Sequence, residues 1–321
     1  MMKRISILLL ALVPTMLWAQ FAPEAGVAGT TAMHADSSAF VAWATGCVIE
    51  RGPQQIDDSS LGLVSYGADA DAIGKADNMV VSLGDGGTAV LTFDSPICNQ
   101  QGPDFAVFEN PFHSMPHCFL ELAFVEVSSD GENYFRFPAV TKVPSDEQMG
   151  SFGVMDATLI HNFAGKYEVM YGTPFDLDEM PDNVLLNKNK ITHIRLVDVI
   201  GTINPEYATY DSEGHIVNDP FPTPFYSSGF DLDAIGVIHD LAHFDVSENE
   251  VMSIAMYPNP VKDRLTVKVD NLQSVEVYNL VGQLVMTSSS SVIDFGDLNA
   301  GLYFVRVMAE GKTVTKRIVK Q

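Results

Sequence analysis

Residues 265–279 read LTVKVDNLQSVEVYN, two runs in which apolar and polar side chains alternate. Alternation with a period of two places the apolar residues on one face of an extended strand, so the stretch predicts two half-buried strands. Pro258 and Pro260 precede it, as suits an entry segment, and Gly282 follows where a turn requires a free backbone. The pattern returns before the C-terminus, and it predicts a small β-sandwich as a separate domain over residues 255–321.

Four motifs follow one another in this C-terminal segment. They are the opening Met256-Tyr257-Pro258-Asn259-Pro260, the turn at Gly282, the stretch Leu298-Asn299-Ala300-Gly301-Leu302-Tyr303 and the basic end at 316–320. Their order resembles the type A C-terminal sorting domain of the Por (type IX) secretion system. The resemblance implies export across the outer membrane, then cleavage of the domain and release or surface anchoring, with the secretion machinery as a partner. An ordinary β-sandwich that caps the main domain is the alternative interpretation.

Residues 1–20 have the organisation of a secretory signal peptide. Lys3 and Arg4 precede an apolar run from residue 5 to 13, and Ala19 lies where cleavage is expected. The run is too short to span a bilayer, and we expect no transmembrane segment in the mature chain. These features predict a protein that is secreted or held at the outer-membrane surface, reached through the periplasm.

The charge is divided unevenly along the chain. Residues 21–250 carry eight Lys or Arg against 35 Asp or Glu, whereas residues 251–321 carry eight against six. A domain this acidic repels nucleic acid and anionic lipid, and it favours cations or neutral polar ligands such as sugars. Solubility of a secreted protein also accounts for an acidic excess. Three cysteines, Cys47, Cys98 and Cys118, leave at least one thiol free, and a bond between Cys98 and Cys118 stays open.

The acidic region predicts an all-β domain. Short apolar or alternating runs are separated by turn sequences such as Asp85-Gly86-Gly87, and long helical periodicity is almost absent. Such punctuation is typical of a sandwich or barrel. The expected strands are 88–93, 105–109, 123–127, 134–137, 191–199 and 230–238. The long segment 201–228, rich in Pro, Asp and aromatic residues, is expected to be a functional loop.

Several stretches of this region resemble uncharacterised bacterial cell-surface proteins with a galactose-binding-like jelly roll. The stretches are 72–77, 81–87, 104–110, 124–131 and 229–235. The turn Val127-Ser128-Ser129-Asp130-Gly131 is similar to those of discoidin-type and carbohydrate-binding modules. The resemblance implies a jelly-roll β-sandwich over 21–245, joined by a linker at 246–254 to the sorting domain at 255–321. Proteins with this fold bind many different ligands, so the fold alone does not identify the ligand.

Acidic residues on apolar strands predict a calcium site. A carboxylate on such a strand has to be solvated, paired or metal-bound, and Ca²⁺ is held by six to eight oxygens. In jelly rolls that resemble this domain, acidic residues of the first and last strands hold a structural calcium. By position, Asp231 or Asp233 matches the last-strand ligand and Asp77 loosely the early one. An exposed strand face paired with an arginine is the alternative. The expected ligands are Asp77, Glu109, Asp198, Asp231 and Asp233.

His113, His117 and Cys118 lie within six residues of one another, together with Met115. These are soft or borderline ligands that copper, zinc or a cobalt-bearing cofactor uses. Pro116 prevents a regular helix, so the spacing does not itself bring the two rings together. An exposed loop apex is the alternative interpretation.

Aromatic residues in loops suggest a rim for a ligand. Sugars stack on exposed rings while carboxylates and amides bond their hydroxyls. For any single ring, filling of the core or fixing of the long loop is the more common role. The residues expected to bind ligand are Phe112, His113, His117, Tyr210, Phe221, Phe225 and Tyr226. Catalytic motifs are scarce. Glu109 and Glu121 could form the carboxylate pair of a glycoside hydrolase, but a domain with 35 acidic residues offers many such pairs.

Together these features predict a secreted or surface-bound, non-catalytic protein that binds a glycan or another small polar ligand with structural calcium. Capture of a nutrient or metallo-cofactor for an outer-membrane transporter is one alternative. A glycoside-active hydrolase and a purely structural envelope protein are the others.

Overall fold

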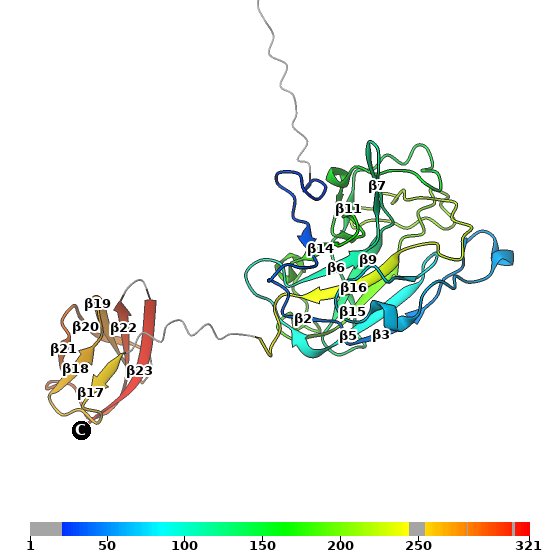
Figure 1. Cartoon of the computed structure of the whole chain (residues 1–321). Coiled ribbons are helices and arrows are strands. Elements are labelled where there is room, and N and C mark those ends of the chain that lie inside the picture. The colour runs from blue at the N-terminus through cyan, green and yellow to red at the C-terminus, as the bar shows by residue number, and fades with distance from the viewer. Residues whose placement is uncertain (1–20, 244–253, 281, 310–311) are drawn as a thin grey trace, which may run out of the picture. The chain divides into compact units, whose positions relative to one another are not determined.

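The computed structural model describes residues 21–243, 254–280, 282–309 and 312–321, which form two compact units that meet in sequence at His243 and Phe244 (Figure 1). The predicted signal peptide at 1–20 and all but the last residue of the predicted linker lie outside the described residues. Each unit is an all-β sandwich, as the sequence predicts, and within the described ranges the helical elements are four short 3₁₀ turns. These are η1 (Ser59–Leu61), η2 (Asp69–Ala72), η3 (Ala157–Leu159) and η4 (Leu177–Glu179).

Two antiparallel sheets build the N-terminal domain. The first has the order β1-β14-β6-β16-β2, with β4 also paired to β16. Its strands are β1 (Met33–His34), β2 (Ala42–Trp43), β4 (Val81–Ser82), β6 (Phe105–Glu109), β14 (Tyr171–Phe175) and β16 (Asp231–Val237). The second has the order β10-β9-β15-β5-β3, with β13 also paired to β9. Its strands are β3 (Gly46–Glu50), β5 (Thr88–Ile97), β9 (Ala123–Ser128), β10 (Phe135–Arg136), β13 (Phe163–Ala164) and β15 (Ile191–Asp198).

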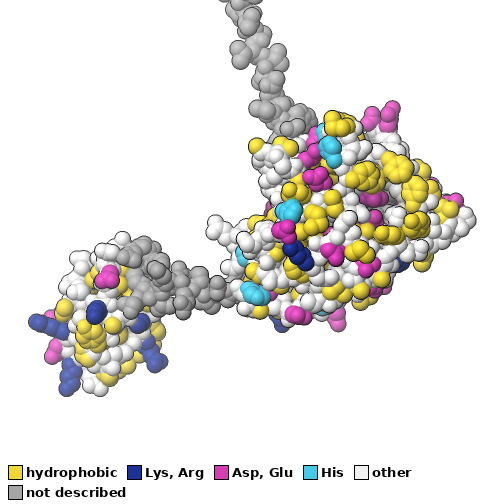
Figure 2. Space-filling model, viewed as in Figure 1, with side chains coloured by type: hydrophobic (Ala, Val, Ile, Leu, Met, Phe, Trp, Pro, Cys, Tyr) yellow, Lys and Arg dark blue, Asp and Glu magenta, His cyan; other side chains and the backbone are white. Residues whose placement is uncertain are grey.

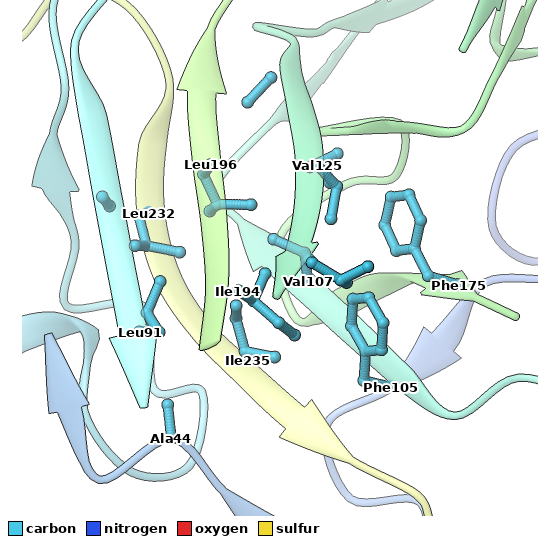
Figure 3. Close-up of a cluster of buried hydrophobic side chains, with 14 of the residues drawn as sticks. Ala44, Leu91, Phe105, Val107, Val125, Phe175, Ile194, Leu196, Leu232 and Ile235 are labelled. Atoms are coloured by element: carbon cyan, nitrogen blue, oxygen red, sulfur yellow. The ribbon is translucent and has the colours of Figure 1, made fainter. Parts of the chain in front are cut away.

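The main core fills the space between these sheets. Side chains of β6 and β16, such as Val107 and Leu232, face side chains of β9 and β15, such as Val125 and Leu196 (Figure 3). A second apolar cluster that includes Phe108 covers the opposite face of the first sheet. Because β6 and β16 are buried on both faces, every residue of both strands is buried, including their carboxyl groups.

Two short pairs lie outside the sheets. They are the hairpin of β7 (Phe112–Ser114) with β8 (His117–Phe119), and the pair of β11 (Val140–Thr141) with β12 (Ile160–His161). The β7–β8 hairpin follows directly on β6, so it rises from the end of a fully buried strand. All six predicted strands are confirmed with small shifts of their ends, whereas the galactose-binding-like relationship stays a prediction. The open question of a disulfide is answered by three free thiols at Cys47, Cys98 and Cys118.

The C-terminal domain packs a three-stranded sheet, in the order β17-β18-β21, on a four-stranded sheet, in the order β20-β19-β22-β23. Buried residues of both sheets, among them Leu265, Val277 and Val305, form one core. The alternating runs quoted above are therefore strands, as predicted. Their bounds are β17 (Ala255–Tyr257), β18 (Arg264–Lys268), β19 (Leu272–Asn279), β20 (Leu284–Ser288), β21 (Val292–Asp294), β22 (Gly301–Ala309) and β23 (Lys312–Lys320).

Separate cores predict separate responses to core mutations. Phe105→Ala removes a fully buried ring from the inter-sheet core, so we expect it to lower the free energy of unfolding of the N-terminal domain by about 3–5 kcal/mol. Fluorescence of Trp43, the one tryptophan beyond residue 20, reports that transition in urea. Val277→Ala, in the C-terminal core, is the control and leaves it unchanged. An equal shift in both variants would contradict independent unfolding.

Candidate functional site

A cavity of about 340 Å³ opens on the N-terminal domain beside the β7–β8 hairpin. Four separate segments contribute to it: the hairpin and its flanks, the loop at 151–152, the long loop at 223–227 and the start of β16. Figure 2 shows hydrophobic side chains gathered around recessed Asp or Glu side chains on one face of this domain. The lining residues are Asn110, Phe112, Phe119, Glu121, Ser151, Phe152, Thr223, Phe225, Tyr226, Ser227 and Asp231.

A row of aromatic rings forms the wall of the cavity. Phe112 and Phe119 are cross-strand partners in the hairpin, and their rings stack with centroids 4.9 Å apart. Phe152 continues the row at 6.1 Å from Phe119, and Phe225 follows at 5.7 Å from Phe152. Phe112 is 50% exposed and Phe152 is 69% exposed. Grouped apolar side chains that remain in water mark a surface that binds something.

The long loop predicted to be functional supplies part of this wall, and hydrogen bonds fix its position. The Asn218 side chain donates to the carbonyl oxygens of Pro144 (2.7 Å) and Glu147 (2.8 Å). The Gln148 side chain donates in return to the carbonyl of Gly201 at 3.1 Å. Because these bonds tie the loop to residues 144–148, Phe225 is held in a defined place although it lies in irregular structure.

Two carboxyl groups, those of Glu121 and Asp231, lie at the floor of the cavity. Leu120 and Leu122 are buried in an apolar cluster, so Glu121 between them projects to the other side of the chain. Burial raises the pKa of Glu121 well above its usual range, and repulsion from Asp231 and other carboxyl groups raises it further. Asp231 accepts a short hydrogen bond from the Ser82 hydroxyl, yet burial raises its pKa to about 6.

Behind the floor lie further buried carboxyl groups that repel one another. Glu109 is 2% exposed and Asp219 is 3% exposed, and burial raises the pKa of both well above the usual range. Of the charged neighbours that raise the pKa of Glu109, Glu121 has the largest effect. Oε2 of Glu109 and Oδ1 of Asp219 have no hydrogen-bond partner. Buried carboxyl groups that raise one another's pKa values resist simultaneous ionisation, and a bound cation would relieve the repulsion.

The five predicted calcium ligands do not come together as one site. Asp198 accepts hydrogen bonds from the backbone N–H groups of Gly86 (2.9 Å) and Phe230 (2.7 Å). Asp233 accepts from the N–H groups of Asp77 and Asn78, both at 3.1 Å. These carboxylates thus fix backbone segments that lie far away in the sequence. Glu109, Asp198 and Asp231 do belong to the repelling group around Glu121 and Asp219.

The carboxylate oxygens of that group are of the kind that calcium binds in proteins. No three of their carboxylates, however, bring one oxygen each within 4.8 Å of one another in the described part of the chain. Calcium binding by Asp77, Glu109, Asp198, Asp231 and Asp233 therefore stays a prediction.

Of the residues predicted to bind ligand, Phe112, Phe225 and Tyr226 line the cavity. Phe221 is buried, and Tyr210 lies at an isolated bridge with Ile216, so neither lines it. His113 and His117 also lie outside the lining. Sequence reasoning missed Phe119 and Phe152 as part of the wall and Asp231 as part of the floor, and it considered Glu121 only for hydrolysis. Glycines beside Phe152, at 150 and 153, were the one local sign of an exposed loop.

A larger cavity, of about 550 Å³, lies elsewhere in the domain and begins at Phe21. Its polar groups already bind one another: His161 Nε2 lies 3.2 Å from Glu179 Oε2, and the Asn162 side chain donates to the same oxygen at 2.6 Å. The aromatic cavity is the better candidate for a ligand, because exposed rings line it and the carboxyl groups behind its floor include two oxygens without a hydrogen-bond partner.

Comparison with known proteins identifies the C-terminal domain. Residues 255–321 match the family model of the secretion system C-terminal sorting domain. The chain is therefore exported by the type IX system and is secreted or held at the cell surface. In the described part of the chain, no helix has the length and apolar character needed to cross a membrane.

A curated relative is an ulvan lyase, NLR42, from Nonlabens ulvanivorans, with 37% identity over 83 residues. The match covers 23% of this chain and 16% of that protein. Among solved structures, β-glucuronidase of Ruminococcus gnavus in complex with uronic isofagomine is 12% identical, with a TM-score of 0.20. The match covers 94% of this chain and 45% of the glucuronidase chain. The same enzyme alone gives 12% identity and a TM-score of 0.18, with coverages of 88% and 43%. Scores this low carry no weight for fold or function.

The raised pKa values predict that stability falls as the pH rises. An unfolded aspartate titrates near pH 3.9, whereas burial raises the pKa of Asp231 to about 6 and of Asp85 to about 7. Between these limits the folded state binds more protons, so the free energy of unfolding decreases with pH. We expect a loss of ~1–3 kcal/mol between about pH 4.5 and pH 8 in urea titrations with chelator present. Asp231→Asn should reduce the slope, and a stability that rises across this window would contradict the expectation.

Proposed function

We propose that the N-terminal domain is an exported carbohydrate-binding domain and that its ligand occupies the cavity between the aromatic row and the carboxyl floor. The observation that carries the proposal is the meeting of both features in one cavity: exposed rings such as Phe152 and Phe225, and buried acids such as Glu121. The type IX sorting domain supports it, because it delivers the cavity to the medium where polysaccharides are met.

A sugar complements this cavity in shape and chemistry. One face of a pyranose ring exposes C–H groups that pack on an aromatic ring, while its edge carries hydroxyl groups. Protonated or ionised, Glu121 and Asp231 accept hydrogen bonds from hydroxyls, and a protonated carboxyl group also donates one. A volume of about 340 Å³ lies at the lower end of the range of about 300–1,000 Å³ for small-molecule sites, which suits one or two sugar rings. The name of the curated relative, an ulvan lyase, agrees with a ligand of this class.

Catalysis of glycoside hydrolysis is the second candidate, because burial raises the pKa of Glu121 well above its usual range, which is the direction that a general acid needs. A glycosidase also needs a partner carboxylate that stays ionised, so that the two pKa values are pushed apart. Here burial raises the pKa values of Glu109, Glu121 and Asp231 in the same direction, and repulsion between carboxyl groups raises those of Glu109 and Glu121 further. This shared direction favours binding without catalysis.

Aromatic substitutions test the binding site. Phe152→Ala and Phe225→Ala each remove one exposed ring of the wall, and we expect each to weaken binding roughly tenfold, from about 1–1.5 kcal/mol of ring contact. The ligand is first identified by screening the chain without residues 1–20 on an array of glycans, and affinities follow from calorimetry. Tyr210→Ala, which alters an exposed ring away from the cavity, is the matched control.

The same titrations separate binding from catalysis. Incubation of the protein with its best array ligand should release no new reducing ends and no unsaturated product. Turnover that disappears in Glu121→Gln would establish the hydrolase or lyase alternative. Binding that is unchanged in Phe152→Ala and Phe225→Ala, but lost in Tyr210→Ala, would show that the sugar site lies elsewhere.

We also propose calcium as the cation that offsets repulsion among the carboxyl groups of Glu109, Glu121, Asp219 and Asp231. We expect millimolar calcium to raise the midpoint of thermal unfolding and to reduce the loss of stability at pH 8, because a cation favours the ionised carboxylates. Glu109→Gln with Asp219→Asn should remove most of this stabilisation. Asp69→Asn, in the exposed η2 turn, is the control. Equal unfolding midpoints in calcium and in chelator would refute the proposal.

A further inference from the structure

The β7–β8 hairpin has a second face with a different chemistry. Side chains of neighbouring positions in a strand point to opposite faces, so the pair His113 and Cys118 lies opposite the stacked pair Phe112 and Phe119. Glu24, from the segment that precedes the first strand, joins them on this side. One ligand atom from each of Glu24, His113 and Cys118 lies within 4.8 Å of the other two, and within the described ranges no other set of three His, Cys, Asp or Glu residues does so.

The spacing within this trio matches that of metal ligands. Cys118 Sγ lies 3.7 Å from His113 Nδ1. Zinc binds sulfur at about 2.3 Å and imidazole nitrogen at about 2.0–2.1 Å, so a tetrahedral angle places the two ligand atoms about 3.6 Å apart. The thiol and the imidazole are therefore already at the separation that one shared ion requires.

The surroundings of the trio also suit a bound ion. His117 Nδ1 lies 3.2 Å from Glu24 Oε1, and a partner of this kind orients a ligating carboxylate. A cavity of about 130 Å³ lies beside the three residues. Lys166 and Glu168 also line it, and the Lys166 ammonium donates to the carbonyl of Ile160 at 2.8 Å. Cys118 is 4% exposed, whereas His113 is exposed, so an ion can enter from the solvent side.

We propose that Glu24, His113 and Cys118 bind a divalent transition metal ion of the zinc class and leave a fourth coordination position open to the small cavity. One oxygen, one nitrogen and one sulfur ligand form a borderline set that favours zinc or cobalt over calcium or magnesium. Three protein ligands with an open position are typical of sites where the metal exchanges a further ligand.

The ion would fasten the N-terminal segment to the back of the hairpin whose front carries Phe112 and Phe119. Metal loading therefore restricts the motion of the aromatic wall. The site itself does not depend on which ligand the aromatic cavity binds.

Cobalt titration of the chain without residues 1–20 tests the proposal. We expect one equivalent of Co²⁺ to give tetrahedral visible bands and a thiolate-to-cobalt charge-transfer band in the near ultraviolet, both removed when Zn²⁺ displaces the cobalt. Cys118→Ser should abolish the charge-transfer band, and His113→Ala should weaken binding by roughly tenfold or more. Cys98→Ser and His215→Ala, which alter a buried thiol and an exposed histidine elsewhere, are the matched controls.

Three results would overturn the site: cobalt binding without a thiolate band, a band that survives in Cys118→Ser, or a band lost in Cys98→Ser. If Cys118→Ser does not fold, which thermal unfolding shows, His113→Ala decides alone, because His113 is exposed and its removal leaves the core intact. Unchanged cobalt affinity in folded His113→Ala would then refute the proposal.

Discussion

Repulsion among buried carboxyl groups is the constraint on which the candidate site depends. Glu109 ends a strand that is buried on both faces, and Glu121, Asp219 and Asp231 lie within its electrostatic reach. Some neighbouring acids are stabilised by backbone N–H groups, as Asp198 is by Phe230. The floor of the aromatic cavity lacks enough such donors, so protons, a cation or the hydroxyls of a ligand have to stabilise it. The packing of the domain thus sets which protonation states and which bound groups the floor of the cavity can have.

The β7–β8 hairpin connects two surfaces of different chemistry. Its Phe112 and Phe119 face the cavity, while His113 and Cys118 face Glu24. A two-stranded hairpin without a third strand is only marginally stable by its own hydrogen bonds. Contacts of its two faces therefore contribute much of the stability of this hairpin. A metal ion bound on one face would therefore affect the aromatic wall on the other through the strands that they share.

The sequence predicts the strands well, because apolar runs such as 105–109 and 191–199 are long, regular and bounded by turns. The sequence predicts the roles of the acidic residues less well. Asp233 and Asp198 were predicted as calcium ligands, and backbone N–H groups of distant segments donate hydrogen bonds to both carboxylates; no local pattern shows such donors. Phe152 and Glu24 were missed for the same reason: each lies in irregular structure and reaches its site only through long-range packing.

The two cation proposals concern sites that discriminate between ions by their donors. The carboxylates behind the cavity offer only hard oxygens, whereas Glu24, His113 and Cys118 offer oxygen, nitrogen and sulfur. Calcium present in excess outside the cell would not displace a zinc-class ion from the thiolate. In a compartment that permits disulfides, an exported chain with three free thiols also risks oxidation. Burial protects Cys98, and a bound ion would protect Cys118, the thiol with an exposed histidine beside it.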